Sequence, residues 1–170
     1  MIRYIKVSLA FLLMTGVFSS CRVGYSFTGA SIPVEAKTIS ITHFPNEAPL
    51  VVPTMSQVLT DALRDRFSSQ TSLNLVSRDG DLHIEGAITN YTTAPTAIQG
   101  NETAALNRLT ITVRVKFVNR YKETDNFEQS FTRFSDYPST QNLNSIQTGL
   151  IDEITQALVD DIFNKAVVNW

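Results

Sequence analysis

The chain of 170 residues contains only one cysteine and two histidines. A single cysteine excludes an internal disulfide, so the stability of the fold must come from its core. His43 and His83 match no recognisable pattern of metal ligands, and each is interpreted as a surface or hydrogen-bonded residue. No Gly-x-Ser-x-Gly elbow or glycine-rich phosphate loop occurs, and Asp79-Gly80-Asp81 is interpreted as a turn rather than a calcium loop. We therefore expect a protein that is not an enzyme and that holds no metal or cofactor.

An excess of positive charge is also lacking. The chain has 14 basic and 16 acidic residues. Residues 1–20 contain two of the basic residues and none of the acidic ones, so the chain without them has 12 against 16, a net charge of −4. General nucleic-acid binding depends on neutralising phosphates with an excess of Lys and Arg. We therefore expect no nucleic-acid partner.

No apolar run reaches the length of about 20 residues that a membrane-spanning helix needs. The mostly apolar stretch from Val7 to Phe18 follows Arg3 and Lys6 and precedes Ser19-Ser20-Cys21. A charged start, an apolar segment and a small-residue cleavage site are typical of a signal peptide. The run Phe18–Cys21 resembles the lipobox of bacterial lipoproteins, in which the cysteine takes a diacylglycerol and is further acylated after cleavage. Phe18 stands where such motifs more often carry leucine.

We therefore predict a signal peptide (1–20), a lipidated tether and lead-in (21–36) and one domain (37–170). The lipobox resemblance implies that Cys21 is the lipidation site and that the protein is attached to a membrane by its lipid. Each buried methylene contributes about 0.8 kcal/mol, and two or more acyl chains hold a protein stably. Arg22 does not match an inner-membrane retention signal, and no acidic run follows Cys21. We therefore expect the periplasmic side of the outer membrane, with an ordinary secreted protein as the alternative.

Two stretches have the three- and four-residue apolar spacing of amphipathic helices. The first starts at Pro53 and ends near Ser68. The second follows Asn142, a residue type that caps helix N-termini, and covers about six turns. Period-two alternation predicts strands at Lys37–Ile41, Leu82–Tyr91 and Leu109–Phe117. A fourth strand, Phe127–Tyr137, is expected to pair back after a polar turn, although its apolar residues do not keep strict period two.

The third of these strands alternates most cleanly, which is typical of a sheet packed on one side only. In the fourth, Phe131 and Phe134 lie three apart, which indicates either a bulge or an aromatic residue on the outer face. Setting aside a doubtful short strand at Leu73–Val76, the order is strand, helix, three strands, helix. The predicted fold class is an α+β two-layer sandwich, with two helices on one face of a four-stranded, mostly antiparallel sheet. The other face stays polar.

Basic residues gather on the third strand and its flanks. Arg108, Arg114 and Lys116 fall on its polar side, with Thr110 and Thr112 between them. One interpretation is a charged face that keeps the protein soluble. The other is a strip that recognises anions, because the planar fork of Arg suits phosphate. We take these three residues as the candidate ligand-binding residues.

Four stretches of the chain resemble the LptE family of lipopolysaccharide-assembly lipoproteins. They are Gly24–Gly29, Thr38–Ile41 leading to Phe44-Pro45-Asn46, Asp81–Tyr91 and Asn107–Ile111. The order of elements and the closing helix near Trp170 also fit. This resemblance implies a lipoprotein that sits as a plug inside a large outer-membrane β-barrel, LptD, and helps deliver lipopolysaccharide to the outer leaflet. Lipopolysaccharide would then be the candidate ligand of Arg108, Arg114 and Lys116.

The alternative is an accessory or carbohydrate-binding envelope lipoprotein of another assembly machine. Sugars stack on exposed aromatic rings. An exposed platform of Phe131, Phe134 and Tyr137 would favour this alternative.

Overall fold

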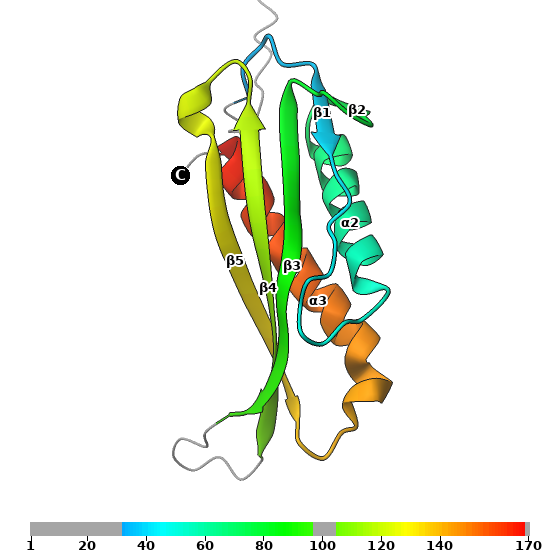
Figure 1. The fold of residues 1–170 in the computed structure, drawn as a ribbon. Coiled ribbons are helices and arrows are strands. Elements are labelled where there is room, and N and C mark those ends of the chain that lie inside the picture. The colour runs from blue at the N-terminus through cyan, green and yellow to red at the C-terminus, as the bar shows by residue number, and fades with distance from the viewer. Residues whose placement is uncertain (1–31, 97–104, 169–170) are drawn as a thin grey trace, which may run out of the picture.

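The computed structural model describes residues 32–96 and 105–168 (Figure 1). The predicted signal peptide (1–20), Cys21 and most of the predicted tether lie outside these ranges. Within them, the chain forms five strands and two α-helices in the order β1 (Thr38–Ile41), α2 (Met55–Gln70), β2 (Asn74–Val76), β3 (Leu82–Pro95), β4 (Leu106–Asn119), β5 (Phe127–Pro138) and α3 (Leu143–Phe163). A 3₁₀ turn (Glu123–Asp125) precedes β5, and a π-helical turn (Asn164–Val168) continues α3.

All five described strands belong to one mixed sheet with the order β2-β1-β3-β4-β5. β1 runs parallel to both of its neighbours, β2 and β3. β3, β4 and β5 pair as antiparallel neighbours along most of their length. Figure 1 shows α2 and α3 on the same side of the sheet, with α3 crossing diagonally behind the three long strands. The described residues therefore form a two-layer α+β sandwich, as predicted.

The prediction of a four-stranded, mostly antiparallel sheet is wrong in the strand count, and the described sheet is mixed because β1 is parallel to both of its neighbours. β2 lies inside the stretch Leu73–Val76 that the prediction set aside. It has three residues, and Leu75 is 42% exposed, so it carries no alternating apolar pattern. α2 returns the chain to the end of the sheet where β1 began, and strands joined by such a crossover are parallel.

Both predicted helices are present with nearly the predicted starts. α2 begins at Met55, two residues beyond Pro53. α3 follows Asn142, whose side-chain Oδ1 accepts a hydrogen bond from the Asn144 N–H at 2.9 Å. The predicted N-cap is confirmed, and it satisfies one backbone N–H that the first turn leaves unpaired. Neither helix is long and apolar enough to cross a membrane, which holds for residues 32–96 and 105–168.

The core lies between the helices and the inner face of the sheet. β4 shows the predicted alternation, because five of its residues are at most 1% exposed, namely Leu109, Ile111, Val113, Val115 and Phe117. The two helices meet where Phe67 of α2 contacts Phe163 of α3 edge to face, with ring centres 5.0 Å apart. Burying one such side chain contributes about 1.5–3 kcal/mol. This apolar layer is the main source of the domain's stability.

The chain stays against the sheet after β1, although Pro45 interrupts the regular strand. The Thr42 N–H and the Pro45 carbonyl oxygen both hydrogen-bond to β3, at 3.0 and 2.9 Å. Between these two bonds Phe44 is fully buried. Its ring lies over Gly86 of β3, where an added Cβ would be 2.5 Å from Phe44 Cε1. Gly86 therefore leaves the space that Phe44 fills.

β3 contains a β-bulge at Thr89. Its register against β4 shifts between Ile88 and Asn90, and Ile88 and Tyr91 are both buried as a result. The Tyr91 hydroxyl accepts a hydrogen bond from Gln147 Nε2 of α3 at 2.7 Å. Bulges re-aim side chains in this way, and here the bulge ties β3 to the start of α3.

β5 pairs with β4 without a register shift. The spacing of Phe131 and Phe134 is therefore not caused by a bulge. Phe131 is 8% exposed on the inner face, and Phe134 is 52% exposed on the outer face. Of the two predicted explanations, the outward-facing aromatic residue is correct.

Candidate functional site

Arg108, Arg114 and Lys116, called here the basic strip, lie on the solvent-facing side of the sheet. This side is called the outer face. Successive residues of a strand point to opposite faces, so β4 presents the basic strip to solvent while its apolar residues fill the core. The three side chains are 40%, 52% and 50% exposed. The structure thus brings them to one face along one strand.

Arg108 is held on two sides. Its Nε and Nη2 donate to Oδ1 and Oδ2 of Asp136 at 2.7 and 2.8 Å, the bidentate geometry of a strong Arg–carboxylate pair. Its guanidinium carbon lies 3.6 Å from the centre of the Phe134 ring. The hydrogen bonding lowers the pKa of Asp136 and raises that of Arg108. The fork of Arg108 is therefore already occupied.

Lys116 and Arg114 also face carboxylates. Lys116 Nζ donates to Glu85 Oε1 at 2.8 Å, and this bond raises the pKa of Lys116 and lowers that of Glu85. Arg114 Nη2 lies 3.7 Å from Glu47 Oε2, which is an ion pair without a hydrogen bond. Exposed pairs of this kind contribute about 0–1 kcal/mol. A competing anion can therefore displace these carboxylates at small cost.

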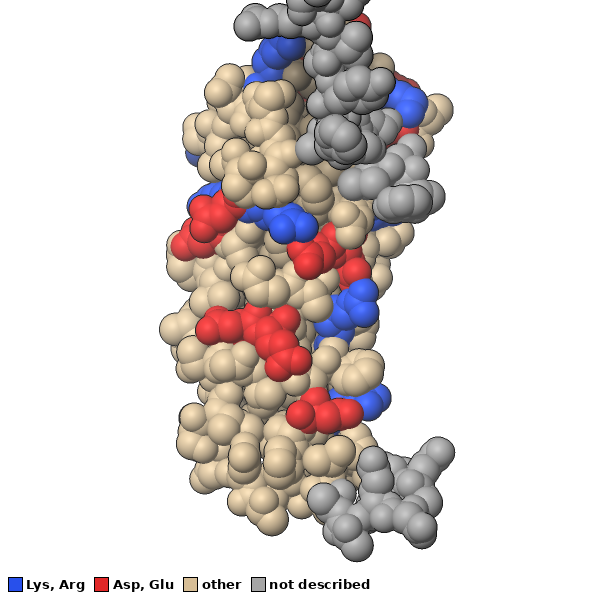
Figure 2. All heavy atoms as spheres, turned by 180° about the vertical axis from the view of Figure 1, so that it is seen from behind, with Lys and Arg blue, Asp and Glu red and all other residues tan. Residues whose placement is uncertain are grey.

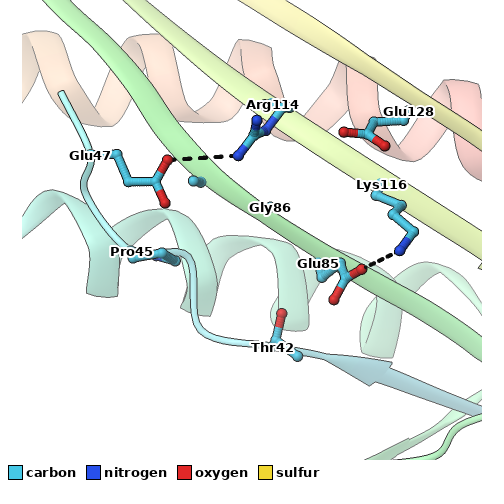
Figure 3. A pocket seen from close by; sticks show the side chains of 9 residues that line it. Thr42, Pro45, Glu47, Glu85, Gly86, Arg114, Lys116 and Glu128 are labelled. Atoms are coloured by element: carbon cyan, nitrogen blue, oxygen red, sulfur yellow. Dashed lines mark hydrogen bonds and ion pairs between the residues drawn. The ribbon is translucent and has the colours of Figure 1, made fainter.

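Part of the basic strip lines a shallow groove of about 520 Å³ on the outer face (Figure 3). The segment that follows β1 forms one side of the groove, and β3, β4 and the start of β5 form the rest. Its charged lining consists of Glu47, Glu85, Glu128, Arg114 and Lys116. With three carboxylates and two cations, the formal charge is −1. We call it the carboxylate groove.

A second groove, of about 420 Å³, adjoins the first at Lys116 and Glu85. Two further cations line it, Arg78 and Arg120, together with Asp79. Its formal charge is therefore +1, from three cations and two carboxylates. We call it the arginine groove.

The turn before β3 forms one rim of the arginine groove. Its backbone is fixed by Gly80, whose N–H donates to Ser40 Oγ at 3.1 Å. Asp81 Oδ2 accepts hydrogen bonds from the N–H groups of Lys37 and Thr38 at 2.9 and 3.0 Å. These bonds, that from Lys37 first, lower the pKa of Asp81. Asp81 thus joins the start of β1 to the start of β3.

Three residues of the outer face form a Ser–His–Glu chain with the composition of a catalytic triad. Ser40 Oγ lies 2.8 Å from His83 Nδ1, and His83 Nε2 lies 3.5 Å from Glu85 Oε2. A nucleophile has to reach its substrate. Ser40 is 0% exposed, and its Oγ already accepts the Gly80 N–H. The chain therefore holds β1, β3 and the turn together, and His83 is the hydrogen-bonded residue that the sequence predicts.

The aromatic platform that would favour carbohydrate binding is not formed. Phe131 and Tyr137 are 8% and 5% exposed and belong to the core. Phe134 alone of the three is exposed, and Arg108 lies over its ring. The carbohydrate-binding alternative loses the observation that would have supported it.

The opposite side of the molecule, formed by the helices, carries acidic and basic side chains side by side (Figure 2). Arg66 of α2 lies 2.9 Å from Asp160 of α3. Arg133 of β5 donates from Nε to Asp161 Oδ2 of α3 at 2.6 Å. These charges connect neighbouring elements, and we place the candidate site on the outer face.

The prediction from sequence missed the carboxylate partners of the basic strip and the contribution of Arg78. Glu85 and Asp136 meet their cations across strands, and such pairs depend on register, which the apolar pattern does not specify residue by residue. Arg78 follows the short β2 that the prediction set aside. The lipidation residue Cys21 lies outside the described residues. In the part of the chain that the structure describes, no group of three or more His, Cys, Asp or Glu is arranged to hold a metal.

The fold and the outer face place the chain among two-layer α+β domains that leave one face of the sheet open to a ligand or partner. The LptE family model, described as lipopolysaccharide-assembly, matches residues 36–166. The match covers more than half of the chain, and the chain therefore belongs to the LptE family. This is a family of non-enzymatic lipopolysaccharide-assembly proteins, and the predicted family is confirmed.

Solved structures resemble this chain at low sequence identity, and the two with a TM-score of at least 0.50 share its fold. A putative neuraminyllactose-binding hemagglutinin homolog from Helicobacter pylori is 10% identical with a TM-score of 0.51, over 83% of this chain and 88% of that chain. The hypothetical protein CT253 from Chlamydia trachomatis is 7% identical with a TM-score of 0.50, over 77% and 98%. A minor lipoprotein from Acinetobacter baumannii is 16% identical with a TM-score of 0.48, over 78% and 96%. No curated protein sequence matches the chain.

Proposed function

We propose that this protein is a lipid-anchored outer-membrane lipoprotein that binds and plugs LptD, the β-barrel that translocates lipopolysaccharide. The observation that carries this proposal is the match of the LptE family to residues 36–166. The run Phe18–Cys21, with the charged and apolar segment before it, supports an anchor on Cys21 at the periplasmic side of the outer membrane. The protein acts by binding and not by catalysis.

The shape of the domain suits a position inside a barrel. Figure 1 shows an elongated molecule whose long axis follows β3 and β4. Each of these strands has 14 residues, which corresponds to about 45 Å at about 3.3 Å per residue. The hydrocarbon core of a bilayer is about 30 Å thick, so the strands are long enough to follow a barrel wall through it.

The outer face also suits a barrel interior. Barrel interiors are polar, and the basic strip enters such surroundings with each of its cations already facing a carboxylate. Docking then leaves no cation of the basic strip buried without a partner, which would be costly.

Affinity purification from detergent-solubilised outer membrane tests the partnership. The tagged wild-type protein should recover a large β-barrel that mass spectrometry identifies as LptD. Val113→Asp buries a charge in the core and unfolds the domain, so this variant should lose the barrel and serves as the control. Recovery of no barrel by a folded wild-type protein would count decisively against the proposal.

We further propose that the basic strip contacts lipopolysaccharide. Three cations on an open face support it, although an anionic ligand must compete with Asp136, Glu47 and Glu85. Changing the three strip residues together to Gln should weaken binding to purified lipopolysaccharide, most strongly at low salt. The fold should survive, because surface substitutions usually cost within about 0.5 kcal/mol each. A folded triple variant with wild-type binding would show that the strip is a solvated face.

A further inference from the structure

We infer that the arginine groove is a phosphate-binding site in which Arg78, Arg120 and Lys116 hold a phosphoryl group. It is the phosphate-selective part of the outer face, and it shares only Lys116 with the basic strip. For a phosphorylated glycolipid as the ligand, the inference rests on the proposed function. For a soluble phosphate as the ligand, the inference does not depend on the proposed function.

Charge distinguishes the two grooves. The carboxylate groove has a formal charge of −1, because Glu47 and Glu128 outweigh Arg114. The arginine groove has a formal charge of +1, because Arg78 and Arg120 outweigh Asp79. Lys116 and Glu85 line both grooves and cancel in the comparison. An anion is therefore attracted to the arginine groove and repelled from its neighbour.

The cations of the arginine groove have free hydrogen-bonding capacity. Among residues 32–96 and 105–168, Arg78 forms no ion pair with a carboxylate. Arg120 reaches only Asp79, at 3.5 Å, and the Asp79 side chain is 87% exposed, so water competes for this pair. Arg108 of the basic strip, by contrast, is bound in a bidentate pair and stacked on a ring. A phosphoryl group suits the fork of Arg78 and that of Arg120, whose only carboxylate contact is long and exposed.

The backbone that carries these side chains is fixed before any ligand arrives. Arg120 follows β4 directly, and its N–H donates to the Asp81 carbonyl oxygen at 3.1 Å. On the other rim, Gly80 packs so closely on β1 that an added Cβ would be 2.5 Å from the Ser40 nitrogen. Fixed rims reduce the ordering cost of binding. A volume of about 420 Å³ lies in the range of small-ligand pockets, about 300–1,000 Å³, so the groove has room for a phosphoryl group and part of its carrier.

Calorimetry with sodium pyrophosphate on the full-length lipidated protein in detergent tests the site. Arg78→Gln/Arg120→Gln should weaken binding about tenfold or more, as expected for the loss of charged hydrogen bonds. The matched control Arg66→Gln/Arg133→Gln removes the same charge from residues that pair with α3, outside both grooves, and should change binding by less than about twofold. Equal losses in the two variants, wild-type affinity in the first variant, or no binding by the wild type would overturn the inference.

Lipopolysaccharide before and after phosphatase treatment identifies the source of the phosphoryl group. If it is the glycolipid, the wild type should bind the treated material more weakly, and Arg78→Gln/Arg120→Gln should bind both alike. If phosphatase treatment weakens lipopolysaccharide binding equally for the wild type and the variant, while pyrophosphate binding still depends on Arg78 and Arg120, the site serves a soluble phosphate. Recovery of LptD by the same preparations is measured in parallel. If the wild type recovers LptD but does not bind pyrophosphate, this inference alone is refuted. If the folded wild type does not recover LptD, the proposed function is refuted.

Discussion

Replacement of glycine by alanine should change the stability of this domain in opposite directions at two positions. In β3, a Cβ on Gly86 would lie 2.5 Å from Phe44 Cε1 and would also clash with the backbone carbonyl oxygen of Arg114. In α3, a Cβ on Gly149 would meet no atom within 4 Å. The substitution is the same in both cases, and only the surroundings of the new methyl group differ.

The magnitudes follow from these surroundings. The Arg114 carbonyl belongs to the paired strand, so it cannot move away without disturbing the sheet. Overpacking of a core costs about 1–3 kcal/mol, and the reduced entropy of the unfolded chain offsets about 0.4–1 kcal/mol of it. We expect Gly86→Ala to lower the free energy of unfolding by about 1–2 kcal/mol. Gly149→Ala should raise it by about 0.5–1 kcal/mol, because Ala is the better helix former.

Urea denaturation of the mature chain, followed by circular dichroism, measures both effects as shifts of the midpoint at constant slope. Phe44→Leu removes the ring atoms over Gly86, so the double variant should be less destabilised than the sum of the two single variants. A Gly86→Ala midpoint at or above that of the wild type would refute the reasoning from close packing. A Gly149→Ala midpoint below that of the wild type would refute the helix reasoning.

Four further predictions concern single residues or pairs. The pKa of Asp81 is lowered in the folded state, so its contribution to stability is complete above its ordinary value of 3.8 and is lost as the pH falls through the folded value. As the pH is lowered toward about 3, the urea midpoint of Asp81→Asn should therefore decrease less than that of the wild type. An equal decrease in the two proteins would contradict this prediction. Asn142→Ala should lower the free energy of unfolding by about 1 kcal/mol because the N-cap is lost. An unchanged urea midpoint would show that the cap does not stabilise the domain. Arg133→Gln should cost about 0.5–1 kcal/mol, and combining it with Asp161→Asn should add little, whereas additive losses would show that the pair is not coupled. Cys21→Ala should abolish labelling by a fatty-acid analogue without changing the thermal unfolding of the domain, and equal labelling of variant and wild type would exclude Cys21 as the lipidation site.

The parts of the fold that the sequence predicts are those in which local pattern and burial agree. β4 is predictable because every second residue from Leu109 to Phe117 is apolar and the sheet is packed on one side. α3 is predictable from its long apolar stripe and from Asn142 before it. β2 is not, because three residues at the edge of a sheet have no period to detect. Its parallel pairing is set by the return of the chain through α2, which is a tertiary property.

The candidate site shows the same division. The common face of Arg108, Arg114 and Lys116 follows from alternation alone. That Arg108 is bound to Asp136 and that Lys116 is bound to Glu85 depends on cross-strand register, which the apolar pattern leaves open. The arginine groove depends on the turn at Arg78 meeting the end of β4 in space, and no local pattern reports that contact.

The mixed sheet also has a consequence for the order in which the domain opens. β3, β4, β5 and α3 are consecutive in the chain, and each strand of this group pairs with the next. β1 instead joins β3 through three registered pairs, the first of them between Ile39 and Leu82. Such short, long-range pairings close late in folding and open early in local unfolding. Amide hydrogens of β1 and β2 should therefore exchange with solvent before those of β4. The end of the sheet that follows the N-terminal tether can then loosen while the antiparallel strands and α3 remain folded.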